Sequence, residues 1–365
     1  MVGKPGRPEE QPDTAEMQEV ARLFYSEDIT RQEISKRLHI DPRKVSWLLE
    51  QARALGVVRI DIRAPLENDI AGRLQRKFPR LERVFVVRGS PLVTGGQRRE
   101  FFRRAGTVAA DYFDELIAQG GRRQVINIGV SGGEPTFQFA NAIRLRARDE
   151  VKVQVTALIG RNRLQTENVD PCTVATVLWN QCGSIHHHFD YMSVEPYWFE
   201  LLDREDDVSQ QRAHIASELG RLERLRDVRT IIERMNHLHV VFGAFGSVRA
   251  RHQHPETEIV ETMSEFISPE FGHALAEEGV IADFCYCPFD SNGRTDKRWK
   301  LFLTAGHYSE NRGIDFYKHM VASGKKVVGF GGPGLFGAIN AALKAEIVNV
   351  LIIDEFTARQ IADEI

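Results

Sequence analysis

The sequence predicts two folded parts: a small all-α helix-turn-helix domain, and a larger Rossmann-like α/β domain with a mostly parallel sheet. Three observations support this prediction. Residues 30–55 carry two short amphipathic helical patterns joined by a tight turn. From about residue 84 onward, short apolar runs alternate with helical patterns, as in parallel sheets that helices cover on both faces. A chain of 365 residues is also long enough for two or three domains.

The composition is that of an ordinary globular protein, with 42% hydrophobic and 27% charged residues and a net charge of -3. Four cysteines are too few for a disulfide framework, so reduced thiols in a cytoplasm are expected. Cys285 and Cys287 could form a metal pair, but neighbours on opposite faces of a strand are favoured. Neither a signal peptide nor a membrane-spanning run is apparent. We therefore expect a cytoplasmic protein with no membrane partner, no metal site and no cofactor.

The first domain is expected over residues 13–63, after a disordered tail over 1–12 that is rich in proline, glycine and charge. Thr30 and Glu33 form a capping box that starts one helix. Asp41 caps a second helix, which begins at Pro42. The apolar residues of this second helix recur at three- and four-residue steps, which predicts one buried face: Val45, Leu48, Leu49, Ala52 and Leu55. Alternating residues over 58–63 predict a half-buried strand.

Two short helices joined by such a turn make a helix-turn-helix, whose second helix enters the major groove of DNA. Between Arg31 and Arg63 there are eight Lys or Arg and four Asp or Glu residues, an excess that suits phosphate contacts. The alternative is an ordinary helical hairpin with a solvated charged face. The candidate DNA-binding residues are Arg31, Gln32, Arg43, Lys44, Ser46, Trp47 and Gln51.

Ala64 and Pro65 break the pattern, and we expect a linker over residues 64–82 that includes a helix near 68–78. The α/β domain is expected over 83–365. In parallel sheets, ligands bind beyond the carboxyl ends of the strands. The strand candidates are residues 84–87, 125–130, 151–159, 239–243, 280–289, 327–330 and 348–353.

Glycine-rich turns follow four of these candidates, near residues 131, 246, 290 and 332. One such turn means little, because many strand-to-helix turns carry glycine for geometry alone. Four turns at strand ends suggest the rim of one pocket, in which backbone N–H groups hold a ligand. The candidate effector-binding residues are Ser131, Gly132, Gly133, Glu134, Thr136, Gly243, Phe245, Gly246, Ser247, Asp290, Gly331, Gly332, Pro333 and Leu335.

These segments also carry a resemblance to a known family. QEISKRLHIDPRKVSWLLEQARALGVVRI resembles the N-terminal DNA-binding segment of the SorC/DeoR-type sugar-binding transcriptional regulators, with Trp47 where that family usually has Arg. VVFGAFGSV and SPEFGHALAEEGVIADFCYCPFDSNG resemble segments of its effector domain. VVGFGGPGLFGAINAALKAEIVNVLIIDEFTARQI is similar to its C-terminal stretch. The resemblance implies a sugar-phosphate isomerase-like effector domain, operator DNA as a partner, and a homodimer or homotetramer that acts as repressor or activator.

The chain departs from this family where a phosphate would bind. The family's first loop usually has Thr or Arg residues at the places that Glu134 and Pro135 fill here. Leu335 stands where the family usually has a Lys. A carboxylate at a helix start disfavours a second negative charge. Among a sugar, a polyol and a sugar phosphate, we therefore favour an unphosphorylated or cationic effector. The alternative is that Glu134 only caps its own helix.

Two rival functions stay open at this level. A sugar-phosphate isomerase-like enzyme with an appended DNA-binding domain could use Asp290, Glu134 or Asp354 as a general base. An adaptor could use the helix-turn-helix to bind protein. The sequence favours the regulator for two reasons. A fold alone does not give a function, and an attached DNA-binding domain is typical of a regulator and not of an enzyme.

Overall fold

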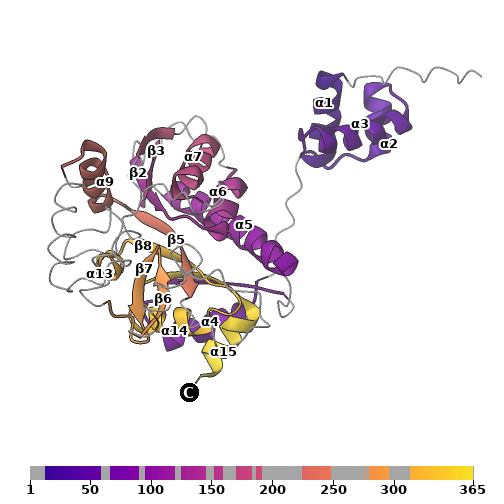
Figure 1. Cartoon of the computed structure of the whole chain (residues 1–365). Coiled ribbons are helices and arrows are strands. Elements are labelled where there is room, and N and C mark those ends of the chain that lie inside the picture. The colour runs from indigo at the N-terminus through magenta and orange to yellow at the C-terminus, as the bar shows by residue number, and fades with distance from the viewer. Residues whose placement is uncertain are drawn as a thin grey trace, which may run out of the picture. The chain divides into compact units, whose positions relative to one another are not determined.

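A computed structural model describes the chain over residues 13–58, 66–89, 95–119, 125–144, 152–158, 170–182, 186–190, 224–247, 276, 279–295 and 313–364. These residues fall into two compact units, Met1–Ile62 and Arg63–Ile365, each of which has its own fold (Figure 1). The predicted tail over 1–12 and most of the predicted strand over 58–63 lie outside the described residues.

The first unit contains three helices: α1 (Thr14–Tyr25), α2 (Arg31–Leu38) and α3 (Pro42–Ala54). The capping box of α2 is confirmed, because Glu33 N donates to Thr30 Oγ1 and Thr30 N donates to the Glu33 carboxylate. Asp41 Oδ1 accepts from Arg43 N at the start of α3. Between the helices, His39 adopts a left-handed conformation with φ 54° and Ser35 Oγ closes the turn on the Ile40 carbonyl.

The predicted buried face of α3 is confirmed with one exception. Val45, Leu48, Leu49 and Ala52 join α1 and Ile34 of α2 in one small core. Leu55, in contrast, is 60% exposed. Leu55 lies at the C-cap, beyond the last helical turn, so the helical periodicity no longer sets the direction of its side chain.

The second unit is built on a parallel sheet with the strand order β1-β9-β8-β5-β2-β3-β4. Its strands are β1 (Arg83–Val87), β2 (Val125–Val130), β3 (Lys152–Ala157), β4 (His186–Asp190), β5 (Val240–Ser247), β8 (Lys326–Phe330) and β9 (Val350–Asp354). Two further strands, β6 (Val280–Phe284) and β7 (Cys287–Asp290), form an antiparallel hairpin that pairs with the end of β5. The mostly parallel sheet predicted from the alternation of apolar runs and helices is confirmed.

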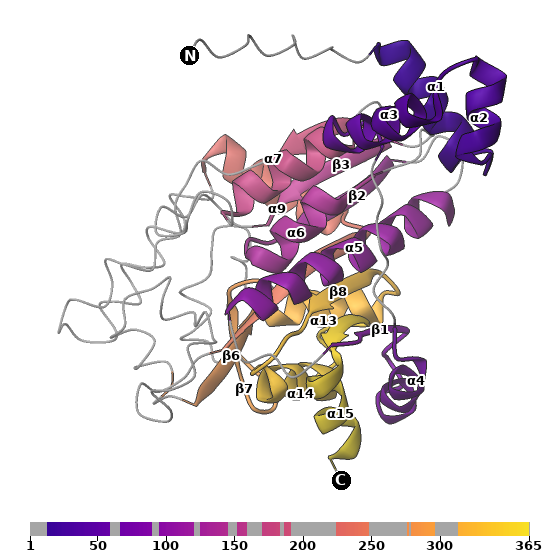
Figure 2. The ribbon, with the colours of Figure 1, turned by 90° about the vertical axis from the view of Figure 1, so that its right-hand side faces the viewer.

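Helices cover both faces of this sheet (Figure 2). One face carries α5 (Gly95–Gln119), α6 (Glu134–Ala142) and α7 (Pro171–Gln181). The other face carries α4 (Asn68–Lys77), α9 (Arg226–Asn236), α13 (Ile314–Ala322), α14 (Phe336–Lys344), α15 (Glu355–Asp363) and the β6–β7 hairpin. Successive residues of the central strands enter opposite cores, as their two-residue period requires. Phe242 stacks on Phe139 of α6 with ring centroids 4.1 Å apart, while its neighbour Val241 packs on the other side.

The segment assigned to a linker from the sequence is largely part of the second unit. Helix α4 packs against β1 and α15 and buries Ile70 and Leu74. Lys77 Nζ donates to the carbonyl oxygens of Ile361 and Glu364. The sequence pattern showed the helix but could not show that its apolar face packs against an element almost 300 residues away.

The strand predicted over residues 280–289 is a hairpin. Cys285 and Tyr286 form its turn, with φ of 51° and 63°. Cys285 therefore lies in the turn and only Cys287 lies on a strand, and both side chains are buried. The expectation of opposite faces of one strand was wrong, because residues two apart on a strand share a face. Within the described ranges, no three His, Cys, Asp or Glu side chains gather as a metal site requires, and no helix is long and apolar enough to span a bilayer.

Candidate functional site

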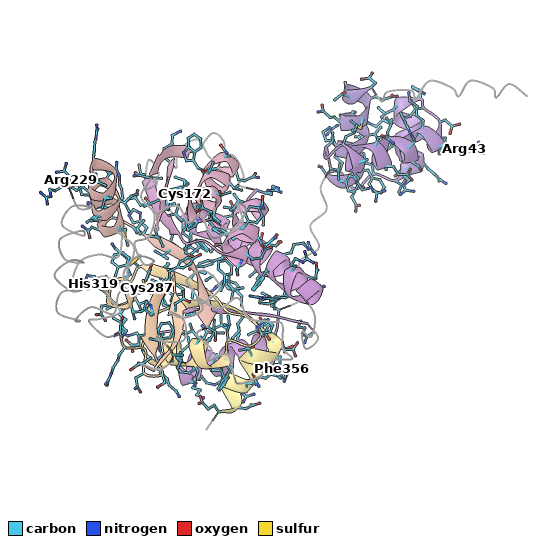
Figure 3. All side chains as sticks on the ribbon, viewed as in Figure 1. Arg43, Cys172, Arg229, Cys287, His319 and Phe356 are labelled. Atoms are coloured by element: carbon cyan, nitrogen blue, oxygen red, sulfur yellow. The ribbon has the colours of Figure 1, made fainter. Side chains whose placement is uncertain are left out.

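The exposed surface of α2 and α3 carries most of the candidate DNA-binding residues. Arg31 and Gln32 are exposed on the first turn of α2, and Arg43 is exposed on the first turn of α3 (Figure 3). Ser46 and Gln51 are half-buried. The first turn of α3 thus presents a cation to solvent, as the first turn of a recognition helix does in known complexes.

Three candidates have structural contacts inside the first unit, and the Arg31 guanidinium lies over the Phe24 ring, 5.5 Å from its centroid. Lys44 Nζ lies 2.7 Å from Glu16 Oε2, so an ion pair ties α3 to α1. Trp47 is half-buried and packs against the small core of this unit. The indole ring is therefore part of the packing of α3, and the sequence pattern had placed it on the solvent face.

The first unit has no net positive charge, and its cations are concentrated on one surface. Over residues 13–58 there are seven Lys or Arg and eight Asp or Glu residues. Glu19 of α1 and Glu27, just after this helix, pair with Arg22, and Glu27 also pairs with Arg37 of α2. The cations left at the surface gather on α2 and α3, so any attraction for DNA phosphates is concentrated on the helix-turn-helix.

In the second unit, the turn that follows β2 lies beside β5 at the carboxyl edge of the sheet. Ser131 N donates to the Phe242 carbonyl at 3.1 Å, and Ala244 N donates to Ser131 Oγ at 3.3 Å. The strand order reverses between these two strands. From β2 the chain continues to β3 on one side, and from β5 it continues, after the β6–β7 hairpin, to β8 on the other side. Such a switch point is where open α/β sheets form a ligand-binding crevice.

The turn over residues 331–335 joins the same edge. It follows β8, which pairs with β5 from Val240↔Lys326 to Ala244↔Phe330. Gly331 N donates to Ile352 of β9 at 2.8 Å. Two of the four predicted glycine turns, those after β2 and β8, therefore lie at one edge, with β5 between them.

The fourth turn lies elsewhere, which corrects the inclusion of Asp290. Gly293, three residues after Asp290, packs against Ala341 and Ala345 at the C-terminal end of α14. The turn over 331–335 lies at the N-terminal end of that nine-residue helix, about 13 Å away at 1.5 Å per residue. The cause is the hairpin: β7 runs parallel to the end of β5, but among the described strands it pairs only with β6 and stays outside the parallel sheet.

Residues 243–247, which the sequence predicted as the second turn, are part of β5, and their glycines have a structural cause. A Cβ on Gly243 would overlap Cys285 Sγ, and one on Gly246 would overlap the Asp283 carboxylate. These glycines let the β6–β7 hairpin pack directly on β5. Ser247 pairs with Ala282 in the same ladder. We therefore remove Gly243, Gly246 and Ser247 from the residues expected to touch an effector.

Several other candidates are core or turn residues. Phe245 is buried against Phe284, with ring centroids 4.9 Å apart, and Leu335 is buried in the same core. The Thr136 hydroxyl donates to the Gly133 carbonyl at 2.8 Å and so closes its own turn. The groups that remain available to a ligand at this edge are the main-chain N–H groups of residues 132–134 and of Gly332 and the side chain of Glu134.

Glu134 does not cap α6. Gly133 is the N-cap residue with φ 112°, and no side chain caps this helix. The Glu134 carboxylate instead accepts from Gln138 Nε2 at 2.6 Å, one helical turn along. A half-buried negative charge thus stands at the uncapped start of α6, where it opposes the binding of an anion.

Sequence reasoning missed a buried polar cluster behind these turns. Asp283 is fully buried, accepts from Tyr286 N at 2.9 Å, and has its pKa raised to about 7 by burial. The Cys285 thiol contacts the hydroxyl groups of Ser131 and Tyr317, and burial raises its pKa to about 12. No local pattern indicated this cluster, because Asp283 and Cys285 lie in a predicted apolar strand while Ser131 and Tyr317 come from distant segments.

Comparisons with known proteins find a sugar-binding domain model and a bacterial regulator. Residues 213–362 match the Sugar-bind family model, which describes a sugar-binding domain. The deoxyribonucleoside regulator of Bacillus subtilis (strain 168) is 24% identical over 350 residues, which cover 95% of this chain and 97% of that protein. The chain is thus similar over most of its length to a bacterial regulator, and part of its second unit matches a sugar-binding domain.

Solved structures of SorC- and DeoR-type regulators share the fold. The full-length sorbitol operon regulator SorC from Klebsiella pneumoniae has a TM-score of 0.68 at 19% identity, over 97% of this chain and 100% of that chain. A DeoR family transcriptional regulator from Listeria monocytogenes has a TM-score of 0.59 at 18% identity, over 80% and 98%. The first match spans both units, so this chain has the two-part architecture of a full-length SorC-type regulator.

The relationship to SorC- and DeoR-type regulators favours a regulator over an enzyme. Three histidine side chains described in the second unit, His237, His239 and His319, lie away from the carboxyl edge. His239 immediately precedes β5, where its Nδ1 accepts from Asn127 N, and His319 lies on the last turn of α13. Neither is placed to form an acid–base pair with Glu134 or Asp354 at the edge.

Proposed function

We propose that this chain is a DNA-binding transcriptional regulator whose second unit binds a small sugar-derived effector and thereby changes the affinity for operator DNA. The observation that carries the proposal is the pairing of two features in one chain. One is a capped helix-turn-helix with Arg43 exposed on its second helix. The other is a parallel sheet whose switch point carries uncapped, glycine-rich turns.

For DNA, we assign direct contacts to Arg31, Gln32 and Arg43, with Ser46 and Gln51 behind them on the same surface. The ion pair between Lys44 and Glu16 gives Lys44 a second role, since it fixes the position of α3 on α1. Trp47 serves the packing of the first unit. Arg43 is then the strongest single candidate, because it is exposed and stands on the turn that reaches base edges in this motif.

For the effector, we assign the main-chain N–H groups of residues 132–134 and of Gly332 and the carboxylate of Glu134. The uncapped start of α6 offers N–H donors, while Glu134 accepts a hydroxyl or amine proton. A neutral sugar or polyol satisfies both, whereas a phosphate group would meet the negative charge of Glu134. The regulators of deoxyribonucleoside and sorbitol genes among the relatives make sugar-derived compounds the first ones to test.

We further propose that the two units act as separate domains in a homodimer or homotetramer. A single helix-turn-helix contacts few base pairs, and such proteins pair on repeated half-sites. An effector that binds one arrangement of the paired DNA-binding units better than the other shifts the balance between them. We assign no catalytic step to the second unit.

The test of DNA binding compares Arg43→Ala with Arg53→Ala in the full chain. Both arginines are exposed on α3, but Arg53 lies on its last turn and bonds the Leu49 carbonyl. Fluorescence anisotropy with DNA from upstream of the protein's own gene should show tight binding that weakens steeply with salt. Arg43→Ala should lose about tenfold in affinity, the effect of one good arginine contact, and Arg53→Ala much less. Equal losses, or a wild-type affinity that does not respond to salt, would contradict the assignment.

A further inference from the structure

The starts of α14 and α15 meet in one corner of the carboxyl edge. They follow the adjacent strands β8 and β9, which pair from Val328↔Val350 to Phe330↔Ile352. The hydroxyl group of Thr357, on the first turn of α15, donates to the Gly332 carbonyl at 3.4 Å. The same hydroxyl group contacts the Asp354 carboxyl. The Asp354 side chain therefore lies beside the glycine turn that opens α14.

The start of α14 has no side-chain cap. Leu335 is its N-cap residue, and an apolar side chain cannot accept from the first N–H groups of the helix. A Cβ placed on Gly337, in the first turn, would meet no atom within 4 Å. The main chain of this helix start is thus open to a ligand atom.

Asp354 carries an unpaired oxygen at this corner. Its side chain is 5% exposed, and Oδ1 accepts from Thr357 N at 2.9 Å as the N-cap of α15. Oδ2 is buried and has no hydrogen-bond partner among the residues that the structure describes. An unsatisfied buried carboxyl oxygen costs free energy, so a donor beyond the described residues, such as a ligand, is indicated. Phe356, two residues further on, is 50% exposed, which places this helix start at the surface (Figure 3).

The chemistry of the corner selects the type of group that fits. Open N–H groups at the start of α14 need an acceptor, and Asp354 Oδ2 needs a donor. A hydroxyl group is both, because its oxygen accepts from the helix while its hydrogen is donated to the carboxylate. A fully ionised phosphate has no proton to donate and would repel an ionised Asp354. Leu335 offers no cation to offset that repulsion.

We propose that Asp354 binds a hydroxyl group of a neutral sugar or polyol at this corner and so selects against phosphorylated ligands. The inference rests on the proposed function and deepens it, because it names a specificity residue of the same edge. It also extends the binding region from the switch point between β2 and β5 to the end of β9.

The test uses isothermal titration calorimetry of the full chain with sorbitol, 2-deoxyribose and the phosphate esters of both. Asp354→Asn keeps an oxygen that can cap α15, since Asn is an equally favoured N-cap residue, but replaces Oδ2 or its equivalent with a donor. The matched control is Asp170→Asn, at the N-cap of α7. Asp170 is also 5% exposed, but its carboxylate accepts from Cys172 N and Thr173 N.

At least one neutral compound should bind the wild type more tightly than its phosphate ester. Asp354→Asn should weaken that binding by about tenfold or more, the effect of losing a hydrogen bond to a charged group, while Asp170→Asn should change it by less than about threefold. Unchanged affinity in Asp354→Asn, or tighter binding of the phosphate esters by the wild type, would overturn the inference and leave the regulator proposal standing. A wild-type protein that binds none of the four compounds would overturn both the inference and the sugar effector.

Discussion

At the scale of single residues, the most informative side chains are buried acids. Asp283 lies under Gly246 in the interior, and Asp354 lies at the edge of the sheet. Burial raises the pKa of both carboxyl groups above the ordinary value. Their partners differ, however. Asp283 accepts from Tyr286 N inside the hairpin, while one oxygen of Asp354 is left for a ligand. The first acid therefore affects folding stability, and the second affects binding.

The raised pKa of Asp283 predicts a pH-dependent stability. Its pKa is about 7 in the folded chain and 3.8 ordinarily, so the unfolded chain loses this proton first as pH rises. This carboxyl group consequently opposes folding more and more between about pH 3.8 and about pH 7. Thermal unfolding should show that Asp283→Asn loses less melting temperature between pH 5 and pH 8 than the wild type does.

Asp290→Asn is the control, since that carboxyl lies half-buried in the turn after β7 and accepts from Asn292 N and Arg294 N. It removes the same charge from the same hairpin without touching the interior. Identical pH profiles for Asp283→Asn and the wild type would show that Asp283 does not hold its proton in the folded chain.

At the scale of elements, several glycines allow strands and helices to pack closely and do not contribute to a ligand site. Gly243 and Gly246 admit the β6–β7 hairpin onto β5, and Gly106 admits α6 onto α5. From the sequence alone, the first two had been assigned to a ligand site. A glycine after an apolar run is compatible with either role, and only the position of the hairpin distinguishes them.

The close crossing of α5 and α6 gives a stability prediction. A Cβ on Gly106 would lie 2.6 Å from the main-chain carbon of Gln138 and 2.8 Å from Phe139 N. Main-chain atoms cannot move aside as a flexible side chain does, so Gly106→Ala should destabilise the second unit by about 1–3 kcal/mol in urea unfolding.

Gly72→Ala in α4 makes the opposite change in a comparable helix. There a Cβ would meet only the flexible end of Arg76 at 3.5 Å. Alanine favours the helix over glycine by about 1 kcal/mol, so this variant should be as stable as the wild type or more stable. A Gly106→Ala protein that unfolds at the same urea concentration as Gly72→Ala would show that the two helices do not cross this closely.

Local signals predicted elements well and their partners less well. The capping box at Thr30, the start of α3 at Pro42 and the parallel sheet depend on neighbouring residues or on periodicity, and these predictions are confirmed. The place of Asp290 and the packing of α4 depend on contacts between distant segments. A two-residue period also looks the same in one long strand and in a hairpin whose turn has no glycine, which is why Cys285 was misplaced.

At the scale of the whole molecule, the chain joins a helix-turn-helix to a sheet whose glycine turns gather at one edge. Its relatives with this architecture are transcriptional regulators. In the function we propose, the effector binds at the carboxyl edge and the readout is the affinity for DNA. Coupling between two such sites is a free energy, and it acts equally in both directions.

The central claim is tested most directly by the affinity for DNA from upstream of the protein's own gene, measured with and without the sugars. Fluorescence anisotropy of the full chain would use one fixed salt concentration and a saturating amount of sorbitol, 2-deoxyribose or either phosphate ester. The account predicts that at least one neutral compound changes the Kd by about fivefold or more, the lower end of typical allosteric coupling. A Kd that stays the same with all four compounds would contradict it.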